Sequence, residues 1–150
     1  MEGFDVLVVI HNVLRWAVLV AAVAAIGGAW HGVVKKREWT KGDRIRTVMY
    51  VATMHIQLLL GLVLYVQSPL VQQAMDDPGS AMGVRELRFF FVEHISLMII
   101  AVVVVQLGSI LSKKAEEDAS KHKRSAICFT IGLVLILAAM PWWRPLFPGL

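Results

Sequence analysis

The chain has 150 residues, of which 57% are hydrophobic, and a formal net charge of +4 at pH 7. Soluble domains of this size are rarely so apolar, whereas about 20 consecutive apolar residues suffice for one membrane-spanning helix. The composition therefore indicates a protein of the lipid bilayer and excludes a separate soluble domain.

Four apolar runs in the chain are long enough to cross a bilayer. Because short connections join them, we expect one all-α, integral membrane four-helix bundle. The N-terminal MEGFD is acidic and lacks the positive region of a cleavable signal peptide, so none is expected. The predicted spans lie at about residues 6–30, 48–66, 89–111 and 126–142.

Most basic residues fall into two of the connections, between spans one and two and between spans three and four. In a four-span protein both connections lie on one side, which the positive-inside rule makes cytoplasmic, with both termini outside. This placement explains the basic charge as a topology signal and argues against nucleic acid as a partner. The residues are Lys35, Lys36, Arg37, Lys41, Arg44, Arg46, Lys113, Lys114, Lys121, Lys123 and Arg124.

Two of the apolar runs contain charged residues, which are costly inside a bilayer and usually mark functional sites. In the first span Arg15 lies one helical turn from His11, so both side chains can face the bundle interior. In the third span Glu93 directly precedes His94. Tyr65, near the outer end of the second span, is within reach of the same level. These five residues are predicted to share the interior of the outer half.

The rise of about 1.5 Å per residue in an α-helix converts sequence position into depth. His11 and His94 are each expected roughly 9 Å below the outer boundary, so they share a level. His55 in the second span is expected near the bilayer midplane, roughly 20 Å from that edge. His31 and His122 fall at or beyond the cytoplasmic boundary and are expected to be solvated.

Two neutral imidazoles at one depth on different helices suit the two axial positions of a haem iron. We therefore predict His11 and His94 as metal ligands of haem b. The single Cys128 cannot form the CxxCH motif that attaches haem covalently. Arg15 or Arg88 could bind the haem propionates.

Other residues of the predicted cluster could assist the haem or a second cofactor. Glu93 could orient an imidazole through its second ring nitrogen. A membrane quinone could dock beside the haem, where Tyr65, Glu93 or His55 would exchange protons with it. The sequence thus favours a b-type haem-binding electron-transfer protein of the membrane that could exchange electrons with a membrane quinone.

The same residues also allow interpretations without haem. Histidines near a membrane interface often bond to a neighbouring helix, and Arg15 and Glu93 could neutralise each other. The alternative function is therefore a non-catalytic membrane subunit or assembly factor of a larger respiratory complex. A transporter or proton path through His55 is a third hypothesis, which the absence of repeats and broken helices disfavours.

Several segments, in order along nearly the whole chain, resemble a known family. They are HNVLRW, HIQLLLGLVLY followed by SP, RFFFVEHISLMI, SKKA…KHKRSAI and the closing PWW. The family comprises small four-span bacterial membrane proteins, frequent in Bacteroidetes and labelled cytochrome B or cytochrome b-like. The resemblance implies a multi-pass protein of the bacterial cytoplasmic membrane, with family histidines at His11, His55, His94 and His122.

Overall fold

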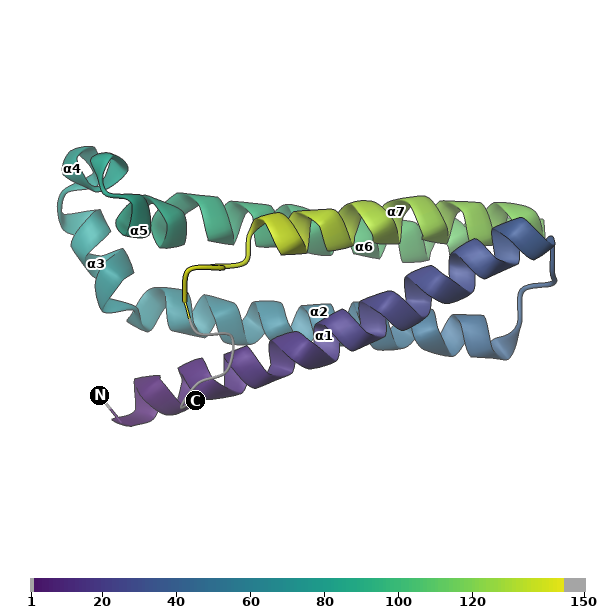
Figure 1. The fold of residues 1–150 in the computed structure, drawn as a ribbon, viewed down its shortest axis with the longest axis horizontal. Coiled ribbons are helices and arrows are strands. Elements are labelled where there is room, and N and C mark those ends of the chain that lie inside the picture. The colour runs from purple at the N-terminus through teal and green to yellow at the C-terminus, as the bar shows by residue number, and fades with distance from the viewer. Residues whose placement is uncertain (1, 145–150) are drawn as a thin grey trace.

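The computed structural model describes residues 2–144, and every regular element in that range is helical. Four long helices dominate, and short helical turns connect the second long helix to the third (Figure 1). The long helices are α1 (Glu2–Lys35), α2 (Lys41–Gln67), α6 (His94–Lys114) and α7 (Asp118–Ala138). The connection contains α3 (Pro69–Asp76), α4 (Pro78–Gly83), α5 (Arg85–Arg88) and η1 (Phe89–Glu93), which is a π-helix.

The long helices pack in a closed ring, in which α1 and α6 each contact both α2 and α7. The start of α1 and the short elements α3 to α5 lie at one end of this elongated molecule (Figure 1). The α1–α2 and α6–α7 connections lie at the opposite end. The prediction of an all-α chain is confirmed for the described residues.

Three stretches among the described residues are long and apolar enough to cross a membrane, namely Gly3–Lys35, Lys41–Gln67 and Arg85–Lys114. They contain the first three predicted spans. Many of their large apolar side chains are exposed, as expected for helices whose outer faces meet lipid rather than water. The structure therefore indicates a membrane protein.

The fourth predicted span differs from the helix that contains it. Helix α7 ends at Ala138, whereas the span was expected to continue to Trp142. Pro141 follows closely, and a proline disfavours helical backbone in the residue before it. The first turns of α7 also carry basic residues, so its apolar part is shorter than those of the other three helices. That α7 crosses the membrane stays a prediction.

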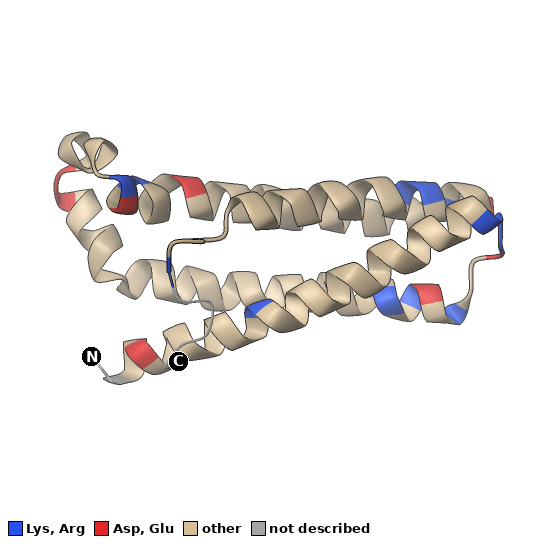
Figure 2. Cartoon of the chain, viewed as in Figure 1, with Lys and Arg blue, Asp and Glu red and all other residues tan. Residues whose placement is uncertain are grey.

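Most of the Lys and Arg residues lie at the end of the molecule formed by the α1–α2 and α6–α7 connections (Figure 2). His122 also lies at this end, but it is fully buried rather than solvated as the sequence predicted. Its ring packs against the backbone of Gly32 and stacks at a tilt with Trp39, with the ring centroids 4.9 Å apart. The sequence interpretation of His122 was wrong because α1 passes directly over its ring.

Gly32 is expected to be intolerant of a side chain, since a Cβ there would lie 2.1 Å from Nδ1 of the buried His122 ring. Substitution Gly32→Ala should lower the free energy of unfolding by about 1–3 kcal/mol, as overpacking typically does. Gly27→Ala is the matched control on the same helix, because no atom lies within 4 Å of its Cβ position. Thermal unfolding in detergent, followed by circular dichroism, should separate the two variants. Equal melting temperatures would contradict the close contact.

Candidate functional site

A cavity of about 700 Å³ lies between the long helices, near the end of the molecule that α3 to α5 form. Its walls are mostly apolar and come from α1, α2, α3, η1, α6 and α7 with the segment that follows it. Several polar side chains interrupt these walls. They are His11, Asn12, Arg15, Gln57, Tyr65, Ser68, His94 and Arg144.

His94, the first residue of α6, is held by a contact with the end of α7. Its Nδ1 lies 2.7 Å from the backbone oxygen of Ala139. A carbonyl oxygen can only accept, so Nδ1 donates this hydrogen bond, and in the neutral form of the ring Nε2 keeps its lone pair. The rings of Phe89 and Phe90 lie beside the imidazole, with centroids 5.7 and 6.1 Å away. These contacts fix the orientation of the ring.

His11 enters the cavity from α1, where α1 crosses α2. Its ring lies over Gly61, at which a Cβ would approach the His11 Cε1 to 3.2 Å. The side chain of Gln57 donates a hydrogen bond of 3.0 Å to the His11 backbone oxygen, which joins the two helices at this level. Among the described residues, the buried Nδ1 of His11 has no hydrogen-bond partner. A buried, unsatisfied ring nitrogen is costly unless a ligand completes it.

The π-helix η1 directly precedes His94 and was not anticipated from the sequence. Its wider turn leaves backbone groups without ordinary α-helical partners, and π-turns of this kind often occur at functional sites. The hydroxyl of Tyr65 donates a hydrogen bond of 2.9 Å to the Phe91 backbone oxygen inside η1. Tyr65 thus lines the cavity and also supports the irregular backbone. Nothing in the spacing of FFFVE distinguishes a π-helix from an α-helix.

Two guanidinium groups also line the cavity. Arg15 is 8% exposed, donates a hydrogen bond of 3.4 Å to the Asn12 side chain and lies 5.7 Å from the ring of Trp16. Arg144 reaches the cavity from the segment after α7, where it pairs with Glu86 and lies over the ring of Phe90. The sequence analysis missed Arg144, because its position beyond the last helix placed it outside every predicted span.

Two other predicted site residues do not line this cavity. Glu93 forms an ion pair of 2.7 Å with Arg88, and both side chains are 42% exposed. His55 is exposed on α2, and its Nδ1 lies 2.8 Å from the Val51 backbone oxygen one turn earlier. The structure therefore brings His11, Arg15, Tyr65 and His94 together, and it places Glu93 and His55 elsewhere. The expectation that Glu93 shares this interior was wrong, since neighbouring residues on a helix point in different directions.

The two tyrosines offer a paired test of this hydrogen bonding. Tyr65→Phe removes the donor to η1 and should lower the free energy of unfolding by about 1 kcal/mol. The hydroxyl of Tyr50 is buried but has no hydrogen-bond partner among residues 2–144. Tyr50→Phe should therefore leave the stability unchanged or raise it slightly. Thermal unfolding of both variants in detergent measures the difference. A Tyr65→Phe variant that is as stable as the unsubstituted protein would contradict the role of the Tyr65 hydrogen bond.

Within the described part of the chain, no group of three or more His, Cys, Asp or Glu side chains could hold a bare metal ion. Comparison of the chain with protein-family models, with curated proteins and with solved structures found no match.

Proposed function

We propose that the protein binds one haem b in the cavity, with His11 and His94 as axial ligands, and transfers electrons in a membrane. The observation that carries this proposal is that imidazoles from α1 and α6 line one cavity. The bond from His94 to the Ala139 carbonyl is the type of contact that orients a metal-ligating histidine and raises its basicity. The unsatisfied Nδ1 of His11 also fits a ring that lacks its ligand.

The residues around the two imidazoles fit the size and charge of haem. The cavity of about 700 Å³ lies within the usual range for cofactor pockets, and its walls are largely apolar like the macrocycle. Arg15 would bind a propionate, since a guanidinium forms paired hydrogen bonds with a carboxylate. Arg144 also lines the cavity, but its guanidinium already pairs with Glu86. When bound, haem supplies one-electron chemistry at a potential set by its axial ligands and its burial.

The proposed setting is the bacterial cytoplasmic membrane, crossed by all four long helices, with the basic end of the bundle in the cytoplasm. The cavity then lies in the outer half of the bilayer. A membrane quinone is the proposed redox partner, because it would reach the cavity from the lipid phase without crossing a polar surface.

A second candidate is a non-catalytic subunit or assembly factor of a larger respiratory complex. It is favoured by the hydrogen bonds that Gln57, Tyr65 and His94 make to backbone oxygens of other elements. In this role the polar groups would only fix how the helices pack. The chain would then co-purify with other subunits and would need no prosthetic group.

The visible spectrum separates the two candidates. The protein is expressed in haem-replete cells, purified in mild detergent, and measured before and after reduction with dithionite. We expect a Soret band that shifts on reduction and a single haem per chain, since the two histidines supply one pair of axial ligands. A colourless preparation that also fails to bind haemin when haemin is added would contradict the proposal and favour the structural subunit.

A further inference from the structure

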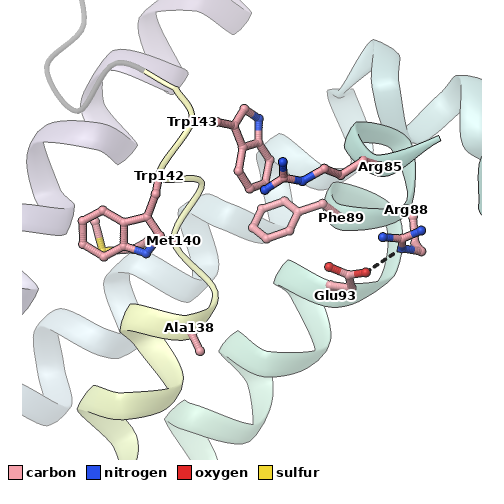
Figure 3. A pocket seen from close by; sticks show the side chains of 8 residues that line it. All are labelled: Arg85, Arg88, Phe89, Glu93, Ala138, Met140, Trp142 and Trp143. Carbon is pink, nitrogen blue, oxygen red and sulfur yellow. Dashed lines mark hydrogen bonds and ion pairs between the residues drawn. The ribbon is translucent and has the colours of Figure 1, made fainter.

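A second pocket, of about 480 Å³, lies where α5 and η1 meet the end of α7 and the segment that follows it (Figure 3). It shares only Met140 with the walls of the cavity described above, so its chemistry is independent of haem. Its charged and aromatic lining residues are Arg85, Arg88, Phe89, Glu93, Trp142 and Trp143.

The cations of this pocket differ in their partners. Arg88 is occupied, since it pairs with Glu93 at 2.7 Å and donates a hydrogen bond of 3.0 Å to the Met82 backbone oxygen. Arg85 forms no ion pair with any carboxylate among residues 2–144. Its guanidinium lies 4.5 Å from the ring centre of Trp143, and Figure 3 shows it extending between Trp143 and Phe89. Among the described residues that line the pocket, there is therefore one more positive charge than negative charge.

The surroundings of the pocket match the boundary between lipid and water. Trp142 and Trp143 are 56% and 40% exposed, and tryptophan is enriched at this boundary. The Trp142 indole donates a hydrogen bond of 2.8 Å to the Leu137 backbone oxygen, which ties this segment to the end of α7. The exposed apolar side chains of Val92 on η1 and Leu137 on α7 belong to residues that directly precede the lining residues Glu93 and Ala138 in the chain. A molecule with a charged head group and an apolar chain would match both the charged pocket and the exposed apolar side chains.

We propose that this pocket binds an anionic membrane lipid through its phosphodiester group, with Arg85 as the phosphate ligand. A guanidinium binds phosphate oxygens through paired, charge-assisted hydrogen bonds, and its aromatic neighbours hold it in place. The acyl chains would run along Val92 and Leu137. An anionic lipid is favoured over a zwitterionic one because the net positive charge of the pocket complements a single negative charge.

The test uses delipidated protein in a neutral detergent, with lipid binding counted by native mass spectrometry and stability followed by thermal unfolding. Phosphatidylglycerol should bind at one preferred site and raise the melting temperature. Phosphatidylcholine and inorganic phosphate at the same concentrations should do neither. Arg85→Gln should weaken phosphatidylglycerol binding at least tenfold. Arg44→Gln, at an exposed position in the first turn of α2, should leave it unchanged.

Three results would overturn the proposal: unchanged phosphatidylglycerol affinity in Arg85→Gln, equal affinity for phosphatidylcholine, or equal protection by inorganic phosphate. The last result would assign the pocket to a soluble phosphate instead of a lipid. If Arg85→Gln does not fold, Arg85→Lys replaces it. Lysine keeps the charge but loses the paired geometry, so a several-fold weaker affinity is expected and an unchanged affinity contradicts the role of Arg85.

Discussion

Substitution of His94 by alanine is expected to abolish the Soret band of the purified protein, and His11→Ala should have the same effect. Each change removes one of the two proposed axial ligands. Mutating a residue that only hydrogen-bonds to a metal ligand typically lowers metal affinity about 10–100-fold. Removing the ligand itself should therefore lower the haem content at least tenfold. Haem content per chain, measured as the pyridine haemochrome, provides the readout.

His55→Ala is the matched control for these two variants. His55 lies in α2, a helix long and apolar enough to cross a membrane, but it is exposed and does not line the cavity. Its removal should leave haem content unchanged. The circular dichroism of all three variants shows whether they are folded. A Soret band that persists in folded His11→Ala and His94→Ala, or that is lost in His55→Ala, would refute the ligand assignment.

Substitution of Asp43 by alanine is expected to cause the largest loss of stability. The Asp43 side chain is 3% exposed, and its two oxygens accept hydrogen bonds of 2.6 Å from the guanidinium of Arg37. One of them also accepts from the backbone N–H of Thr40, at 2.9 Å, which completes the capping box at the start of α2. The bond to Asp43 raises the pKa of Arg37. The guanidinium keeps its charge when Asp43 is removed, because the ordinary pKa of arginine is far above neutral.

Breaking a buried ion pair by removing one partner usually costs about 3–5 kcal/mol. Because Arg37 is 24% exposed and can recover some hydration, we expect the lower end, about 3 kcal/mol, for Asp43→Ala. The matched control is Asp118→Ala, which breaks the more exposed pair with Lys121 and should cost much less stability. Thermal unfolding in detergent measures both, and similar losses would argue against a special role for Asp43.

Several features of the site were predictable because they depend on distance along a helix. The rise per residue places His11 and His94 at one depth, and the helical turn brings Arg15 to the face of His11. All three line the same cavity, together with Tyr65. Binding of haem by these residues stays a prediction.

Other features depend on rotation about helix axes and on contacts between distant segments. The π-turn of η1 precedes His94, and Glu93 turns instead toward Arg88. Arg144 enters the cavity only because the chain folds back after α7. His122 is buried because Gly32 and Trp39, both more than 80 residues away in the chain, close over it.

By itself the sequence determined that the chain is helical, apolar enough for a bilayer and basic at one end, since hydropathy, helical rise and charge position are properties of the linear chain. Only the tertiary structure decided which polar side chains meet in the cavity and which pair elsewhere. The physical reason is that burial and pairing depend on how the helices pack against one another, which no local pattern specifies.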